Sequence, residues 1–469
     1  MSVQQGHDRD ELPPRAAPQR APFVPGGGST VPPPSVPLGF LAAACVGLVG
    51  FGFAVWFAAD HLVRSPMHQG AVSAVHVGML AFLTTAVLGA IHQFAPVVSR
   101  RPLRSVLAAR LTLAGIVATA WLLPTGFAHG PEALVATGGV IGAVTVALAA
   151  WNLSGPLSAR EGGVPLVGLR LSVGFLLATV GFGVVYAFNR QSGWFPLYPH
   201  RVLAHAHLGL LGWLGLTYVA VAEKLWPMFL LAHRPRARAG AWAVGLLGAG
   251  VPVLAAGLLL GNEQVAWPGG VLAGAGLVCH LTSLVTAVTH RRRPLELLHA
   301  YLFASAAFAV SAMVFGVLAA VADVSAGDRA RLVAAEVASL AGWLGLAIVG
   351  HAHKIVPFIT YTALRARGVT TGPDGRPLLF GDLFRKDVAR MALVTGAGGF
   401  VAVVAGIVTT SATTVAIGAV AISTTGVLAG ANLALGPRRA RRTQPVQPAT
   451  ATQLPSNVFP IRQREVTPR

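Results

Sequence analysis

Twelve long apolar segments follow one another along this chain of 469 residues, and they restrict its fold more than any other feature. Crossing the roughly 30 Å hydrocarbon core of a bilayer takes about 20 apolar residues of α-helix. The segments have this length and show no alternation of apolar and polar residues, which excludes strands. The sequence therefore predicts an all-α polytopic membrane protein with twelve transmembrane helices. They are expected over 38–59, 72–95, 105–123, 133–152, 166–188, 202–226, 240–261, 267–289, 297–321, 332–352, 389–410 and 413–434.

The positions of the charged residues predict an orientation. Only 11% of the residues are charged, against about 25% in soluble domains. If the chain starts in the cytoplasm, 30 of the 35 Lys and Arg residues fall on that side, because the opposite side holds only Arg64, Arg190, Arg201, Arg329 and Arg331. This is the positive-inside pattern. We therefore expect the inner (plasma) membrane, cytoplasmic termini, a lipid bilayer as the surroundings and no nucleic-acid partner, although the net charge is +19.

The two ends of the chain differ from the membrane domain, which is expected over 37–435. Residues 1–36 and 436–469 are rich in proline and polar residues and show no helical period. Such composition is typical of disordered segments, because it offers too little apolar surface to bury. We expect a disordered N-tail over 1–36 and a disordered basic C-tail over 436–469.

Matched residues recur at intervals of about 131 positions. His76-Val-Gly-Met-Leu-Ala-Phe-Leu in the second segment corresponds to His207-Leu-Gly-Leu-Leu-Gly-Trp-Leu in the sixth, and both segments end on a proline. The tenth segment repeats the pattern with Val337 in place of the histidine. Such a period predicts an internal repeat. We expect three pseudo-symmetric four-helix repeats over about 37–167, 168–297 and 298–435, with the second, sixth and tenth helices inside.

Histidines are the most informative polar residues inside the predicted membrane. An ionisable group there is costly and is a functional hypothesis by default, and neutral imidazole is the commonest metal ligand in proteins. A structural histidine that hydrogen-bonds to a neighbouring helix is the alternative. The candidate metal ligands at matched repeat positions are His76, His92, His207 and His353. His205 and His351 each lie two residues before one of them, so they point to the opposite face of the helix and extend the candidate cofactor-binding set.

Two carboxylates also lie inside predicted helices. Glu223 occupies the place of His92 in the second repeat, and Glu336 lies near the outer end of the tenth helix. Buried carboxylates in membranes mark proton or cation pathways. We therefore take Glu223 and Glu336 as candidates for a proton path.

The chain resembles the catalytic subunit (subunit I) of the haem–copper oxidase superfamily, in its cbb3-type and nitric-oxide-reductase-like branch. The resemblance covers about residues 38–434. It depends on the second-helix stretch SAVHVGMLAFLTTAVLGAIHQFAPVV, on His205-Ala-His207 and on His351-Ala-His353. It implies twelve helices in three arcs, with His76 as the ligand of a low-spin haem b and His205 or His207 as a copper ligand.

Three departures from that family restrict the function that the resemblance implies. The segment 240–261 contains no histidine, and Leu211 stands where the family has a tyrosine four residues after its sixth-helix histidine. The pair His351 and His353 lies at the inner end of its helix instead of the outer level. The first two departures argue against copper and against a complete terminal oxidase. The third argues against matching His351 and His353 to the family's tenth-helix pair.

The resemblance thus implies a divergent respiratory-chain protein that binds haem b for electron transfer or for handling O2 or NO. If it is an enzyme, it is an oxidoreductase with an incomplete active site, and a redox partner or additional subunit would supply electrons. Two other functions stay open on the sequence. One is a proton-coupled membrane transporter, and the other is an assembly factor that handles haem or copper.

Overall fold

The protein is all-α and polytopic. The computed structural model describes residues 30–233, 238–372 and 375–442, and within these ranges the only non-helical pairing is a single bridge between Thr371 and Pro377. Twelve helices or runs of helices are long and apolar enough to cross a membrane. The chain is therefore an integral, multi-pass membrane protein, as predicted from the apolar segments.

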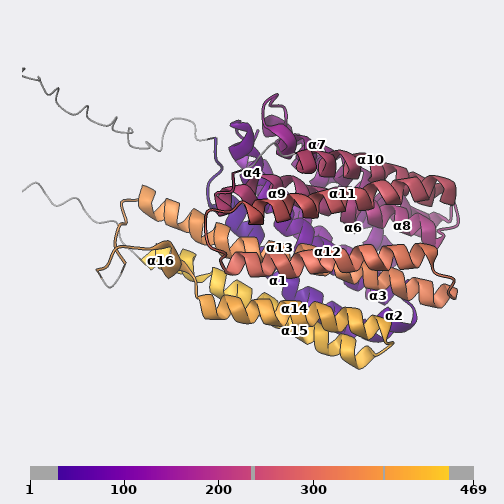
Figure 1. The fold of residues 1–469 in the computed structure, drawn as a ribbon. Coiled ribbons are helices and arrows are strands. Elements are labelled where there is room, and N and C mark those ends of the chain that lie inside the picture. Colours follow the sequence, from indigo (N-terminus) through magenta and orange to yellow (C-terminus); the bar gives the residue numbers. More distant parts are fainter. Residues whose placement is uncertain (1–29, 234–237, 373–374, 443–469) are drawn as a thin grey trace, which may run out of the picture.

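The spans alternate in direction along the chain (Figure 1). Three spans contain more than one labelled helix. The second span contains α3 (Gln69–His76), η1 (Val77–Thr84) and α4 (Thr85–Ser99). The sixth span contains α8 (Pro199–His207), η2 (Leu208–Gly215) and α9 (Leu216–Leu230). The twelfth span contains α15 (Ala412–Leu433) and the start of α16 (Leu435–Arg442). The single-helix spans are α1 (Ser35–Phe57), α5 (Val106–His129), α6 (Glu132–Leu157), α7 (Gly163–Ser192), α10 (Arg238–Leu260), α11 (Glu263–Thr289), α12 (Leu297–Val321), α13 (Ala326–Ala366) and α14 (Lys386–Val408). Two short helices lie between spans, α2 (Ala59–Arg64) and η3 (Phe380–Leu383).

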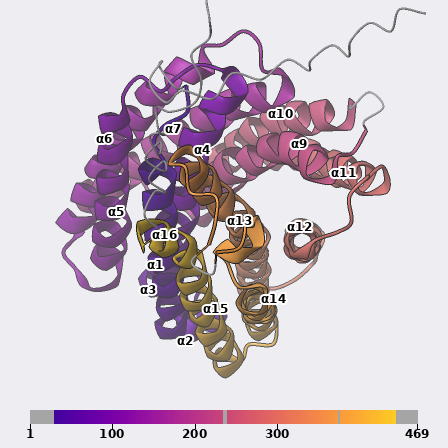
Figure 2. The same cartoon turned by 90° about the vertical axis from the view of Figure 1, so that its left-hand side faces the viewer.

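The second, sixth and tenth spans form the inside of the bundle. Their most apolar windows are 72%, 61% and 61% buried, whereas the corresponding values for the other nine spans lie between 33% and 44%. Seen along the bundle, α4 and α13 lie near the middle, and pairs such as α5 with α6 and α14 with α15 lie at the periphery (Figure 2). The helices that carry the candidate histidines are therefore the ones shielded from lipid.

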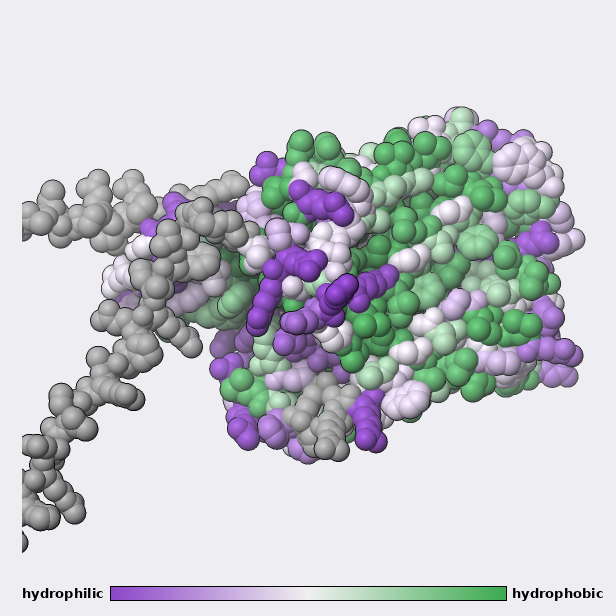
Figure 3. Space-filling view, turned by 90° about the horizontal axis from the view of Figure 1, so that it is seen from above, coloured by the Kyte–Doolittle hydropathy of each residue, from purple (hydrophilic) through white to green (hydrophobic). Residues whose placement is uncertain are grey.

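The surface matches a membrane environment. Exposed apolar side chains occur on the outer helices over their length, including Val144, Trp242, Val271 and Val394. Figure 3 shows the resulting apolar belt, with hydrophilic residues gathered toward the two ends of the bundle. We call the end at which α1 begins the N-side and the opposite end the far side.

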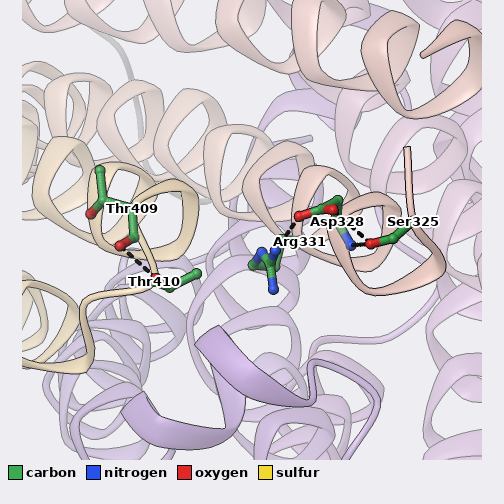
Figure 4. A network of polar contacts seen from close by, with 5 residues as sticks. All are labelled: Ser325, Asp328, Arg331, Thr409 and Thr410. Carbon is green, nitrogen blue, oxygen red and sulfur yellow. Dashed lines mark hydrogen bonds and ion pairs between the residues drawn. The ribbon is translucent and has the colours of Figure 1, made fainter. Parts of the chain in front are cut away.

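The tenth span, α13, is longer than the predicted segment 332–352. At the far side Ser325 caps the helix, because its hydroxyl accepts a hydrogen bond of 3.1 Å from the amide of Asp328, which also pairs with Arg331 (Figure 4). Asx and Ser caps of this kind satisfy amides that would otherwise lack partners. The same view includes Thr409 and Thr410 in the turn between α14 and α15. At the N-side, α13 continues through Pro357 to Ala366.

The predicted tails fall mostly outside the described residues, namely 1–29 and 443–469. Of the predicted N-tail, residues from Ser35 onward already belong to α1. Of the predicted C-tail, residues up to Arg442 belong to α16. The helical part of the chain thus extends slightly beyond 37–435 at both ends, and the amide of Arg438 in α16 donates to the carbonyl of Ala434 between α15 and α16.

Candidate functional site

A cavity of about 370 Å³ lies in the far-side half of the bundle. It is lined by α3, η1, α5, α6, α7, α8 and η2, and most of its lining is apolar. Ligand and cofactor sites commonly have volumes of about 300–1,000 Å³ and an apolar lining with a few convergent polar groups. The polar lining groups here include His76, Thr84, Tyr186, Arg190 and His205. Two of the six predicted histidines therefore meet at one cavity.

His76 is oriented by its own helix. It is the last residue of α3, and its Nδ1 donates a hydrogen bond of 2.8 Å to the carbonyl of Val72. The proton on Nδ1 leaves Nε2 with a free lone pair, which is the arrangement that prepares a histidine for metal binding. On one side the ring packs against Phe127, with 5.0 Å between ring centroids.

His205 lies near His76 in the lining of the same cavity. Their ring centroids are 6.4 Å apart, and the ring planes differ by 21°. Within the described part of the chain, Nδ1 of His205 is buried and makes no regular hydrogen bond, and the ring lies close to the backbone carbonyl of Thr179 on α7. The His205 ring packs closely against Gly183 on α7, because a Cβ at position 183 would lie 3.2 Å from Cε1 of His205.

The separation of the two rings is suited to a shared metal ion. An imidazole nitrogen binds a metal such as zinc at about 2.0–2.1 Å, and the ring centre lies about 1.1 Å beyond that nitrogen. Two imidazoles on opposite sides of one ion therefore have ring centres about 6.3 Å apart. The observed 6.4 Å between His76 and His205 agrees with this value. No group of three or more His, Cys, Asp or Glu side chains in the described ranges is placed to hold a metal ion.

Two π-helical segments border the cavity. η1 begins directly after His76 and η2 directly after His207, and the indole N–H of Trp213 in η2 donates to Thr84 Oγ1 in η1 at 3.2 Å. π-Helical turns are rare and occur often at functional sites. Their wider turns also change the rotation per residue. In a regular α-helix the number of residues between His76 and His92 would set the angle between their directions around the helix axis. Because η1 lies between them, this angle differs from the α-helical value.

His207 is directed away from the cavity. Its Nδ1 donates to the carbonyl of Leu203, and its Nε2 lies 3.7 Å from Glu336 Oε1 on α13. The two histidines of His205-Ala-His207 therefore point to different neighbours, as their spacing on one helix predicts. The resemblance offered His205 or His207 as a copper ligand. Only His205 reaches the cavity that His76 lines.

Three predicted histidines lie elsewhere, toward the N-side. His92, His351 and His353 each donate Nδ1–H to the carbonyl four residues earlier, at 2.7–2.8 Å. Their Nε2 atoms are buried, and none has a hydrogen-bond partner among the described residues. His92 stacks on Phe40 with 5.5 Å between centroids, and His353 stacks on Tyr301 with 5.8 Å. None of the three lines the far-side cavity.

Aromatic side chains occupy the space between the second and tenth spans. Phe400 on α14 packs against Phe51 at 6.4 Å and against Phe308 at 6.0 Å, measured between ring centroids. The cavity that remains beside Phe82 and Phe400 has a volume of only about 10 Å³. The larger cavity beside the second span therefore lies between the second and sixth spans.

Glu223 takes part in a separate buried cluster. Its Oε2 accepts a hydrogen bond of 3.1 Å from Ser283, and its Oε1 lies 3.9 Å from Nδ1 of His280 on α11. Gly240 lies directly beside the carboxylate, since a Cβ there would lie 1.8 Å from Oε2 unless the Glu223 side chain moved. The two predicted carboxylates are thus both adjacent to histidines, in different parts of the bundle.

Comparison with known proteins adds no assignment, since no protein-family model and no curated protein matches this chain. Sequence reasoning missed Tyr186, Thr84 and Arg190 as members of the site. Arg190 had a signal that could have identified it, since it is one of five basic residues expected on the far side. Tyr186 and Thr84 carried none, because their relevance depends on which helices meet.

Proposed function

We propose that this protein is a divergent relative of haem–copper oxidase subunit I that would bind haem b in the far-side cavity, where His76 and His205 would hold it. One observation carries the proposal. Two membrane histidines from the second and sixth spans line one apolar cavity of about 370 Å³, with 6.4 Å between their ring centroids. The bond from Nδ1 of His76 to the Val72 carbonyl leaves the Nε2 lone pair of His76 free to bind a metal, and the buried Nδ1 of His205 makes no regular hydrogen bond.

The residues around the cavity favour electron transfer over gas handling. Bound haem supplies one-electron redox chemistry, and axial ligands, hydrogen bonding and burial set its potential. A haem held by both His76 and His205 would be suited to electron transfer rather than to binding O2 or NO. The Val72 carbonyl increases the basicity of His76 through the bond to Nδ1. Electrons would have to come from a redox partner or an additional subunit.

The three-repeat organisation belongs to the same proposal. η1 and η2 share the spacing of 131 residues that separates His76 from His207. The third repeat has Val337 at this place, and there α13 is a regular α-helix. The wide helical turn therefore accompanies the histidine in two repeats and is replaced by an α-helix in the repeat that carries valine.

Further contacts support the repeat. The stacked pairs Phe40 with His92 and Tyr301 with His353 are related by the same shift of 261 positions, which is two repeat lengths. Asn152 and Asn432 each accept a hydrogen bond from the amide of the residue 47 positions earlier, at 2.8 Å and 2.7 Å. Each bond joins the fourth helix of a repeat to the start of its third helix.

We further propose that the N-side faces the cytoplasm of a plasma membrane, as the positive-inside pattern implies. A single cysteine at Thr409, in a background in which Cys45 and Cys279 are serine, is expected to react with a membrane-impermeant maleimide in intact cells. A cysteine at Ser158 on the N-side should react only after the cells are permeabilised. The reverse labelling would contradict the proposed orientation.

Optical spectroscopy tests the proposed cofactor. Protein purified from haem-sufficient cells is expected to show a Soret band and, in the dithionite-reduced minus oxidised spectrum, an α-band typical of six-coordinate haem b. A pyridine haemochrome assay on the same sample gives the haem type and the number of haems per chain.

A folded, colourless protein that takes up no added haem would overturn the proposal. The second candidate, a proton-coupled transporter, would then be favoured by two specific observations: Glu336 lies beside His207, and Glu223 lies beside His280.

A further inference from the structure

Arg190 lies at the far-side edge of the cavity. It is near the end of α7 and belongs to the cavity lining. Its guanidinium lies over the ring of Phe127, 5.3 Å from the centroid, and the same ring packs against His76 at 5.0 Å. A cation, an aromatic ring and a candidate haem ligand therefore follow one another from the edge of the cavity toward its interior.

The guanidinium of Arg190 has unused capacity to bind an anion. Its side chain is 21% exposed, and its Nε is buried without a partner among the described residues. Its NH2 lies 3.6 Å from Glu132, which is 48% exposed, and 3.1 Å from the side-chain amide of Gln69, whose oxygen accepts a hydrogen bond from it when the amide is turned. Arginine presents five N–H donors in a fork that matches carboxylates, and a largely buried cation is stable only when it is well paired.

Haem b has the complementary shape and charge. Its carboxylates lie together on one edge of an otherwise apolar ring, so an apolar cavity with one cationic edge recognises both its body and its orientation. We propose that Arg190 binds the carboxylates of haem and fixes the haem with that edge toward the far side. This inference rests on the proposed haem function and adds the residue that recognises the acidic edge. Glu132 lies on the more exposed side of Arg190 and can release it to the ligand.

A binding titration with two ligands tests the inference. Haem-free protein is titrated with haem and, separately, with haem dimethyl ester, which has the same ring but no free carboxylates, and absorbance reports binding. We expect the unmodified protein to prefer haem by about tenfold or more, as charge-assisted pairing of a carboxylate with arginine implies. Arg190→Gln is expected to bind the two ligands with equal affinity, and Arg190→Lys to recover part of the preference.

Arg201→Gln is the matched control. Arg201 is also a far-side arginine that lies over aromatic rings, those of Phe195 and Tyr198, but it is not part of the cavity lining. This variant should keep the full preference for haem. Equal affinity for haem and its ester in the unmodified protein would overturn the role of Arg190 and leave the haem function intact. Failure of both ligands to bind would overturn the haem function, and the role of Arg190 with it.

Discussion

His76→Ala is expected to abolish stable haem binding. His76 is the ligand whose lone pair is already directed by a hydrogen bond to Val72, and its loss leaves a haem held by His205 and apolar contacts alone. We expect the haem content of the purified variant to fall by about tenfold or more, since loss of even the hydrogen bond that supports a metal ligand costs about 10- to 100-fold in metal affinity. A pyridine haemochrome assay, normalised to protein, measures the loss.

His205→Ala is expected to have a different spectrum. With one axial ligand removed and His76 kept in place, any haem that remains becomes five-coordinate and gains an open position. Carbon monoxide should then shift the Soret band of the reduced variant, whereas the unmodified protein should not respond. The haem content of His76→Ala and the carbon monoxide response of His205→Ala thus report on the two proposed ligands separately.

His200→Ala serves as the control for both variants. His200 also lies on α8, and its Nδ1 donates to the carbonyl of Leu258, outside the cavity lining. The haem content and spectrum of the His200→Ala variant should match those of the unmodified protein. If His76→Ala kept full haem content with an unchanged spectrum, the haem would have to be held by other residues, and the assignment of the cavity would be wrong.

Much of the architecture followed from the sequence because a bilayer leaves few options. Backbone groups in lipid must be satisfied within the helix, so length and hydropathy alone located the twelve spans. The boundaries were less predictable where polar residues extend a helix beyond the apolar core. α13 continues past Lys354, whose ammonium group pairs with Glu296 at 2.6 Å while its stem remains on the helix.

The candidate site was only partly predictable. Helical spacing indicated that His205 and His207 diverge, but it could not tell which of them faces the second span. That choice depends on how α8 and η2 pack against η1, through contacts such as Trp213 with Thr84, and the sequence carries no local signal for it. The π-helical segments were also unforeseen, because Leu208–Gly215 has the composition of an ordinary transmembrane α-helix. Arg190 and Tyr186 join the site only because the end of α7 lies against α8.

Gly47→Ala is expected to destabilise the fold strongly. Gly47 is where α1 crosses η1, and a Cβ there would lie 2.0 Å from the carbonyl oxygen of Ala81 and 2.8 Å from the amide nitrogen of Phe82. Both contacts are backbone atoms, so no side-chain rotation can relieve them and the two helices must separate. Overpacking of this kind typically costs about 1–3 kcal/mol and sometimes more, and we expect about 3 kcal/mol here.

Gly174→Ala provides the comparison for this prediction. Gly174 also lies inside a transmembrane helix, α7, but a Cβ there would meet no atom within 4 Å. Thermal unfolding in detergent, followed by the loss of monodisperse protein, should show a large decrease in Tm for Gly47→Ala and none for Gly174→Ala. Because η1 begins directly after His76, separation of α1 from η1 should also reduce haem content in Gly47→Ala alone. Equal Tm values for the two variants would mean that α1 and η1 are not in close contact, and the placement of His76 beside His205 would lose its structural basis.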